Sequence, residues 1–215
     1  MSLLALVPLK ALDRAKTRLI PVLRAEERRS VVLAMARHVL SIVGKRADHM
    51  VIITDDHIPE LARFEQLGVG EIGLNPALEI GRRALRHQAA ALLVISADLP
   101  LLRTDEMDAM IAAAARGVAI APDRSGEGTN AIACRADLTM PFCFGPSSFQ
   151  RHRAAALRAG LTPIVVQQSG LATDIDAPAA YRAWQRSVFM AVNEITERIV
   201  PVAPVPALTP QAKTS

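Results

Sequence analysis

The chain has 215 residues, of which 51% are apolar and 3% are aromatic, and its formal net charge is +4. This length suits one α/β domain with a substantial core, and this apolar fraction excludes an intrinsically disordered chain. The apolar runs are much shorter than the ~20 residues of a membrane helix. One Trp, one Tyr and five Phe offer few rings for base stacking. We therefore expect neither a membrane nor a nucleic acid as a partner.

The N-terminal segment and the cysteines indicate the compartment. The first apolar run has no basic residue before it and no small-residue cleavage site after it, which favours a strand over a signal peptide. Cys134 and Cys143 have neither a metal-ligand spacing nor the pattern of a disulfide framework. We therefore expect a cytoplasmic protein.

Short apolar runs rich in β-branched residues alternate with amphipathic segments, the pattern of βαβ units on a mostly parallel sheet. The predicted strands are Leu3–Pro8, Met50–Thr54, Val69–Leu74, Ala91–Ala97, Val118–Pro122, Thr129–Arg135 and Pro163–Gln167. The predicted helices are Arg24–Val43, Ile58–Leu67, Pro76–Ala90, Thr104–Arg116, Ser147–Ala159 and a last one from Pro178 to about Ile199. Residues 200–215 contain four prolines and little to bury, so we expect one α/β domain over residues 1–199 and a disordered tail.

The segment that follows the first predicted strand is strongly basic. It reads PLKALDRAKTRL and carries four cations within nine residues, Lys10, Arg14, Lys16 and Arg18. Ligands of open α/β sheets collect at the carboxyl ends of the strands, so this loop suits a triphosphate. An ordinary solvated basic loop is the alternative.

Three aspartates indicate a metal site. Asp98 comes directly after a predicted strand, and Asp174 and Asp176 stand two residues apart, which puts both on one face of an extended segment. Carboxylates that share a face repel each other unless a cation or solvent separates them, and carboxylate oxygens are ligands that Mg²⁺ accepts. The sequence therefore predicts a three-carboxylate magnesium site. The alternative for Asp98 is the cap of a turn or of the next helix.

Two further segments could bind anions. In DRSGEGT, Gly126 and Gly128 flank Glu127 and could form an anion-binding concavity, although this segment alone favours a plain hairpin turn. In FGPSSF, Ser147 or Ser148 could cap a helix whose free amides bind a phosphate or carboxylate, or the helix is simply capped.

Other signals carry less weight. GVGEIG, from Gly68 to Gly73, matches the dinucleotide-binding pattern. It follows a helix-like stretch rather than a strand, and no acidic residue ends a second strand at the expected distance, so we interpret it as accidental. The five histidines are dispersed and no serine stands in a nucleophile elbow, so a hydrolase triad is not supported.

Six motifs in order resemble the 2-phospho-L-lactate guanylyltransferase family of deazaflavin coenzyme F-420 biosynthesis. They run from about Leu6 to Tyr181 and read PLKALDRAKTRL, GLNPAL, ADLPLL, APDRSGEGTNAI, FGPSSFQRH and DIDAP. The resemblance implies a single α/β domain of the nucleotide-diphospho-sugar-transferase type, a mostly parallel twisted sheet flanked by helices. It also implies GTP, Mg²⁺ and a small phosphorylated three-carbon acid, namely 2-phospho-L-lactate, phosphoenolpyruvate or 3-phospho-D-glycerate.

The resemblance also implies roles for residues at matching positions. Lys10, Lys16 and Arg18 would neutralise the triphosphate, and Asn75 would lie near the base or ribose. Asp98, Asp174 and Asp176 would hold Mg²⁺, with Lys16 and Asp98 as the catalytic residues. Thr129, Gly145 and Ser148 would bind the phosphate and carboxylate of the acceptor acid.

Two alternative functions and one question of assembly remain open at this stage. One is another nucleotidyltransferase of the same fold, of the sugar-phosphate or molybdopterin type, although those enzymes usually open with a glycine-rich loop where this chain has ALDRAKTRL. Another is a non-catalytic nucleotide-binding protein. The sequence also leaves open whether the chain forms a homodimer.

Overall fold

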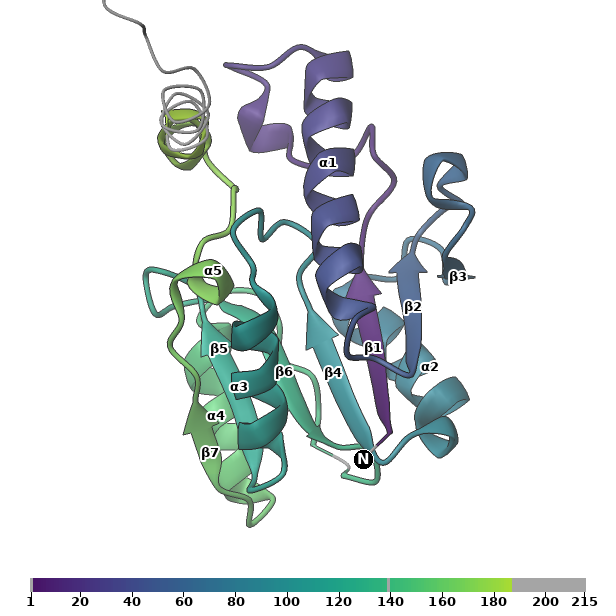
Figure 1. Ribbon diagram of the computed structural model, residues 1–215, viewed down its shortest axis with the longest axis vertical. Helices are drawn as coiled ribbons and strands as arrows, with labels where there is room; N and C mark the ends of the chain where they lie inside the picture. Colours follow the sequence, from purple (N-terminus) through teal and green to yellow (C-terminus); the bar gives the residue numbers. More distant parts are fainter. Residues whose placement is uncertain (1, 139, 187–215) are drawn as a thin grey trace, which may run out of the picture.

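A seven-stranded sheet forms the centre of the molecule, in the order β3-β2-β1-β4-β6-β5-β7 (Figure 1). The computed structural model describes residues 2–138 and 140–186. The strands are β1 (Leu3–Pro8), β2 (His49–Thr54), β3 (Glu65–Gly68), β4 (Ala91–Ile95), β5 (Val118–Pro122), β6 (Thr129–Arg135) and β7 (Pro163–Val165). Among the described strands, β6 alone runs antiparallel to its neighbours, β4 and β5. The predicted mostly parallel sheet is therefore confirmed.

Helices cover both faces of this sheet. The helices are α1 (Ala25–Val43), α2 (Leu74–Leu85), α3 (Thr104–Ala114), α4 (Ser148–Arg158) and the short α5 (Ser169–Ala172). α1 and α3 pack on the face that lies in front in Figure 1, and α2 and α4 pack on the other face. 3-10 turns span Thr17–Leu19, Pro59–Leu61 and Arg86–Gln88. Residues 178–186 are also helical, whereas the rest of the predicted last helix and the predicted tail lie outside the described residues.

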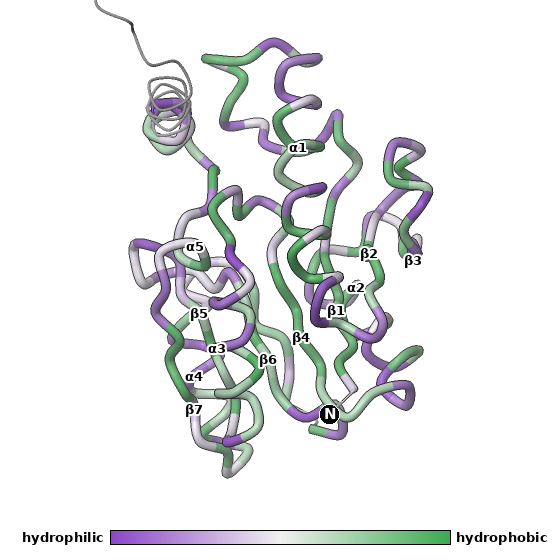
Figure 2. The backbone as a smooth tube through the Cα atoms, viewed as in Figure 1, coloured by the Kyte–Doolittle hydropathy of each residue, from purple (hydrophilic) through white to green (hydrophobic). Residues whose placement is uncertain are grey.

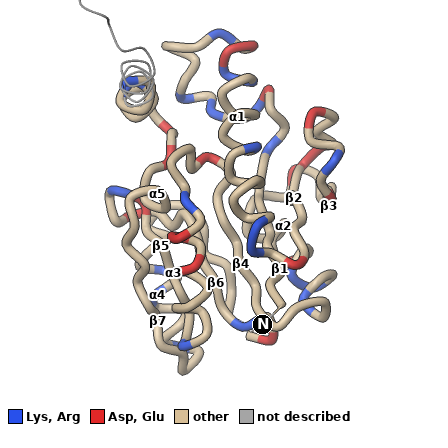
Figure 3. Tube along the Cα trace, in the orientation of Figure 1, with Lys and Arg blue, Asp and Glu red and all other residues tan. Residues whose placement is uncertain are grey.

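The strands read as unbroken apolar runs because both faces of the sheet are covered. In β1, Leu3, Ala5 and Val7 pack on the side of α1, while Leu4 and Leu6 pack on the side of α2. Each fully buried leucine stabilises the fold by about 1.5–3 kcal/mol relative to an exposed one. Figure 2 shows β4 as hydrophobic along its length, and β1 and β4 carry no charged residue in Figure 3. The sheet therefore needs no ion pair in its centre.

Two helices begin with the same capping interaction. In α1, the Arg24 N–H donates to Glu27 Oε2 at 2.8 Å, and in α3 the Arg103 N–H donates to Glu106 Oε2 at 2.9 Å. A glutamate at the third helical position thus satisfies a backbone donor that the helix leaves unpaired. The predicted start of this helix at Thr104 is confirmed, and Asp105 and Glu106 lie in the first turn of α3.

The region between β2 and α2 differs from the prediction. The predicted helix Ile58–Leu67 is a 3-10 turn followed by β3, and the predicted strand Val69–Leu74 is a loop that leads into α2. β3 is a half-exposed edge strand of four residues, so it lacks the apolar run by which inner strands are recognised. Its parallel pairing with β2 decides the outcome, because backbone hydrogen bonds to a distant strand override local helical propensity.

Within the described residues, no helix has the length and hydropathy that crossing a membrane requires.

Candidate active site

Three aspartates meet beyond the carboxyl end of β4. Asp98 follows β4, and Asp174 and Asp176 follow α5. One oxygen of each carboxylate lies within 4.8 Å of the others. Asp98 Oδ1 is buried and has no hydrogen-bond partner, an arrangement that a bound cation would complete. This orphaned oxygen and the all-carboxylate donor set fit a hard divalent cation such as Mg²⁺.

The pKa of Asp174 reflects the negative charge of this cluster. Burial raises the pKa of Asp174 above its ordinary value, and the neighbouring charges of Asp98 and Asp176 raise it further. The structure therefore brings the three predicted metal ligands together at a point where their mutual repulsion favours a cation.

Lys16 reaches the same cluster from the loop after β1. Its Nζ forms ion pairs with Asp98 Oδ2 and Asp176 Oδ1, and 11% of its side chain is exposed. Burial acts to lower the pKa of Lys16, but the two carboxylates outweigh burial, so the pKa is raised. Lys16 therefore keeps its positive charge in the site.

The backbone around Lys16 is held by a buried arginine that the sequence reading missed. Arg28 of α1 donates from Nε to the Ala15 carbonyl at 3.1 Å and from Nη2 to the Asp13 carbonyl at 3.2 Å. Lys16 itself has a left-handed backbone, with φ of 53°. Local spacing identifies Arg28 only as a helix residue, because its partners lie in a loop 13 and 15 positions away.

A cavity of about 710 Å³ extends from Asp98 and Asp176 across β1 and β2 to the loop before α2. Lys10, Lys16 and Arg18, the predicted triphosphate ligands, all line it. Arg14 crosses it, with ion pairs to Asp55 at 3.2 Å and to Glu71. Asp55 also accepts the Ala11 N–H at 2.7 Å and so fixes the basic loop.

Asn75, predicted to lie near the nucleotide, holds a loop in this structure. Its Nδ2 donates to the Phe144 carbonyl at 3.0 Å, and its Oδ1 accepts the Phe144 N–H at 2.8 Å. The amide thus clamps the backbone just before Gly145. Its contact with a nucleotide stays a prediction.

The predicted acceptor residues gather around the start of α4. Thr129 Oγ1 lies 3.0 Å from Nδ1 of the fully buried His152, and His152 Nε2 accepts the Cys143 N–H at 2.9 Å. The Ser148 N–H donates to the Gly145 carbonyl at 3.1 Å. Burial, assisted by Arg151, lowers the pKa of His152 to about 4, so its ring is neutral at pH 7. None of Thr129, Gly145 and Ser148 lines the large cavity or a smaller one of about 340 Å³ beside Asp174 and Asp176.

Asn130 joins the acceptor region to the metal cluster. Its side-chain Nδ2 donates to the Leu171 carbonyl at 2.9 Å and to Asp174 Oδ1 at 3.4 Å. Its backbone carbonyl accepts the Ser96 N–H at 2.8 Å. The sequence reading missed both Asn130 and His152. Their place inside the motifs GTNAI and FQRH was the available signal.

The structure decides between the alternatives for two segments. DRSGEGT forms the hairpin turn between β5 and β6 that the segment favours, and the Glu127 N–H donates to Asp123 Oδ1 at 3.0 Å, so there is no open anion-binding concavity at Glu127. No side-chain hydrogen bond caps α4, where Ser147 has a left-handed backbone with φ of 53°, so the predicted capping serine is wrong. The reason is that this conformation turns Ser147 away from the usual extended cap geometry.

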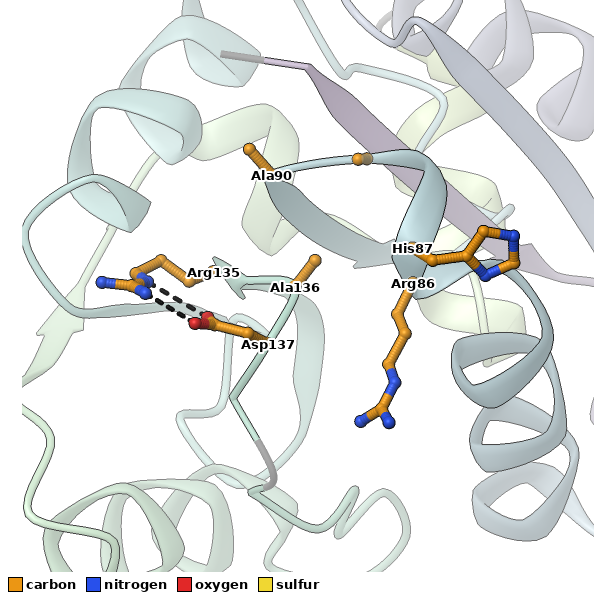
Figure 4. A pocket seen from close by; sticks show the side chains of 7 residues that line it. Arg86, His87, Ala90, Arg135, Ala136 and Asp137 are labelled. Atoms are coloured by element: carbon orange, nitrogen blue, oxygen red, sulfur yellow. Dashed lines mark hydrogen bonds and ion pairs between the residues drawn. The ribbon is translucent and has the colours of Figure 1, made fainter.

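A separate cavity of about 790 Å³ lies at the opposite edge of the sheet, near the start of β4 (Figure 4). Its cations include Arg86 and Arg135, but Arg135 is paired with Asp137. It contains neither the carboxylate cluster nor Lys16. The candidate active site is therefore the cavity beside Asp98.

Known proteins match both the sequence and the fold. A family model described as guanylyl transferase CofC like matches residues 3–181. The phosphoenolpyruvate guanylyltransferase of Sphaerobacter thermophilus is 40% identical over 188 residues, which cover 83% of this chain and 90% of that protein. The protein of the same name from Rubrobacter xylanophilus is 38% identical over 186 residues, covering 83% and 91%.

Solved structures share the fold at low identity. A nucleotidyl transferase from Methanothermobacter thermautotroptrophicus superimposes with a TM-score of 0.64 at 18% identity, covering 89% of this chain and 99% of that one. A Desulfovibrio desulfuricans protein classed with the nucleotide-diphospho-sugar transferases gives a TM-score of 0.69 at 16% identity, covering 82% and 84%. The predicted fold type is thus confirmed. Together with the family match over most of the described residues, this shows that the chain belongs to the guanylyl transferase CofC-like family and is a nucleotidyltransferase.

Proposed function

We propose that this protein transfers GMP from GTP to the phosphate of a small phosphorylated three-carbon acid, in coenzyme F-420 biosynthesis. The observation that carries the proposal is the cavity in which a charged lysine faces three clustered carboxylates. Relatives named phosphoenolpyruvate guanylyltransferase support phosphoenolpyruvate as the acceptor, ahead of 2-phospho-L-lactate and 3-phospho-D-glycerate. The free thiols of Cys134 and Cys143 support a reducing compartment, the cytoplasm.

The reaction is an in-line substitution at phosphorus. An oxygen of the acceptor phosphate forms a bond to the α-phosphorus of GTP, and the bond from that phosphorus to the oxygen bridging to the β-phosphate breaks. Pyrophosphate leaves with the electron pair of that bond. A phosphate monoester is already largely ionised at pH 7, so the step requires no general base. Catalysis then consists of positioning and electrostatic stabilisation.

The chain's own residues divide this work. Lys16 offsets negative charge that develops on the departing pyrophosphate, and Lys10 and Arg18 neutralise the rest of the triphosphate. Asp98, Asp174 and Asp176 would hold Mg²⁺, which supplies positive charge to the phosphate oxygens when it is bound. Thr129, Gly145 and Ser148, which line neither of the two cavities beside the aspartates, are assigned to the acceptor acid by the family resemblance alone.

Pyrophosphate release tests the proposal. The purified chain with Mg²⁺ is assayed with GTP, ATP, CTP and UTP against each of the three acids. We expect release with GTP, and with phosphoenolpyruvate above the other two acids. Release with another nucleotide alone indicates a different nucleotidyltransferase. A folded protein that binds GTP but releases no pyrophosphate with any acid contradicts the enzymatic proposal and supports a binding protein.

A further inference from the structure

The cavity that contains Lys16 has a second end with an apolar wall. There it is lined by the apolar side chains of Ile53, Val69 and Leu74 and by the carboxylates of Asp55 and Glu71. Arg14 pairs with both carboxylates. At the Lys16 end, a cation held by the three aspartates would add its positive charge to that of Lys16 and attract phosphates, whereas an uncharged, planar ring suits the apolar wall and polar rim at the Glu71 end. A nucleotide in this cavity is therefore oriented with its base at the Glu71 end.

The span between the two ends fits this orientation. Asp98 follows β4 and the Glu71 loop follows β3, and these strands are separated by β1 and β2. Three strand spacings of about 4.8 Å give roughly 14 Å between the two ends. That distance suits a nucleotide whose base lies at the Glu71 end and whose α-phosphate lies at the carboxylate cluster.

The backbone of the GVGEIG loop is open to a flat ligand. Gly70 and Gly73 have positive φ values of 66° and 87°, and a Cβ at either position would meet nothing within 4 Å. A ring can therefore approach the peptide planes closely. The sequence predicts that this pattern follows a helix-like stretch, and that prediction is wrong, because in the structure it follows the strand β3, precedes α2 and lines the cavity. The other difference from a dinucleotide-binding fingerprint, the lack of an acidic residue that ends a second predicted strand at the expected distance, still holds.

The two carboxylates at this end are not equivalent. Asp55 is held by the Ala11 N–H at 2.7 Å as well as by Arg14. Glu71 is paired with Arg14, and 70% of its side chain is exposed. Arg14 retains Asp55 if Glu71 changes partner, so Glu71 is the carboxylate that can turn to a ligand at little cost.

We propose that Glu71 reads the base of the nucleotide by accepting the N1–H and the 2-amino group of guanine. This inference rests on the proposed function for the placement of the triphosphate. A carboxylate presents two acceptors and no donor. Guanine offers two adjacent donors on one edge, whereas adenine, cytosine and uracil each place an acceptor beside their donor. Glu71 is thereby a specificity-determining residue, and the loop selects GTP.

Equilibrium binding tests the inference without catalysis. Calorimetry with Mg²⁺ compares GTP with inosine triphosphate, which keeps the N1–H and lacks the 2-amino group, for the unmodified chain, for Glu71→Gln and for Glu71→Ala. The unmodified chain should bind GTP about 10- to 100-fold more tightly than inosine triphosphate, the worth of one hydrogen bond to a charged group. Both variants should bring this ratio close to one. Glu65→Gln, an exposed glutamate of β3 that does not line the cavity, should leave the ratio unchanged.

The outcomes separate this inference from the proposed function. A chain that does not distinguish the two nucleotides, or a ratio that survives in both Glu71 variants, overturns the reading of Glu71 while pyrophosphate release still supports the enzyme. A ratio that collapses in the Glu71 variants of a chain that releases no pyrophosphate supports the base site and contradicts the activity.

Discussion

At the scale of single residues, Asp98 is where three interactions converge. One oxygen pairs with Lys16, while the other is buried without a partner beside Asp174 and Asp176. Asp98 can therefore bind a cation through Oδ1 while Oδ2 keeps its ion pair with Lys16. Both contacts depend on the charge of Asp98, and Asn keeps the shape of the side chain while it removes that charge.

We expect Asp98→Asn to reduce pyrophosphate release by on the order of 10²–10³-fold, since it weakens both the cation site and the partner of Lys16. Initial rates with GTP and the preferred acid measure the loss, and far-UV circular dichroism checks the fold. Asp137→Asn is the matched control, because Asp137 is exposed and lies in the cavity at the opposite edge. Near-normal rates in Asp98→Asn would contradict the metal assignment.

His152 makes stability depend on pH in a predictable direction. Its pKa is about 4 in the folded chain and about 6.5 when unfolded, so the unfolded state binds more protons between these values. The stability of the neutral ring is fully present above about pH 6.5 and is lost as the pH falls toward 4. The loss reaches about 2 kcal/mol at pH 5.

Urea denaturation at pH 7.5 and pH 5 measures this effect. The fall in unfolding free energy between the two values should be smaller in His152→Gln than in the unmodified chain, because glutamine does not titrate. His87→Gln, at an exposed histidine, should show the full fall. An equal fall in His152→Gln would show that another group is responsible.

At the scale of elements, Asn75 and His152 connect helices to the segment 142–146. Asn75, near the start of α2, makes two hydrogen bonds to Phe144, and His152 of α4 accepts the N–H of Cys143. Phe144 also packs edge-on against His152, with ring centres 4.8 Å apart. Helices on one face of the sheet thus fix the segment that leads to Gly145 and Ser148.

Asn75→Ala should lower the unfolding free energy by about 2 kcal/mol, because two partly buried backbone groups of Phe144 lose their hydrogen bonds. It should also raise the KM for the acceptor acid more than the KM for GTP, since the clamped segment leads to Gly145. Urea denaturation and steady-state kinetics measure the two effects, with Arg83→Ala on the exposed side of α2 as the control. A rise confined to the KM for GTP would instead support the predicted contact of Asn75 with the nucleotide.

At the scale of the whole molecule, the sheet brings charge from distant parts of the chain to one edge. Lys16 comes from the loop after β1, Asp98 from the end of β4, and Asp174 and Asp176 from beyond α5. These four groups sum to two negative charges. A cation that binds the folded chain, and not the unfolded one, must stabilise the assembly of these segments.

Mg²⁺ should therefore raise the melting temperature of the unmodified chain in a saturable manner. At a hundred times the dissociation constant the stabilisation is about 2.7 kcal/mol. Thermal denaturation with increasing MgCl₂, against NaCl at matched ionic strength, measures the shift. Asp98→Asn should show a reduced shift and Asp137→Asn a full one. Chelation that leaves both melting temperature and pyrophosphate release unchanged would count against a metal site.

The sequence by itself determined the elements whose pattern is local. The fully buried strands β1, β4 and β5 read as apolar runs because helices cover both faces, and α1 reads from its helical spacing. The order of six motifs also sufficed to indicate the family. The aspartates could be predicted as a cluster because Asp98 directly follows an apolar strand, while Asp174 and Asp176 stand two residues apart, on one face of an extended segment.

Only the tertiary structure decided the features that depend on distant partners. β3 exists through its pairing with β2, Asn75 is engaged by Phe144 across 69 positions, and Lys16 meets Asp98 across 82. Local periodicity reports which side of a segment is buried, but it does not report which remote group satisfies a given donor or acceptor. The β3–α2 loop that carries Glu71 could not be placed from its sequence, because β3 becomes a strand only once β2 supplies its backbone partners.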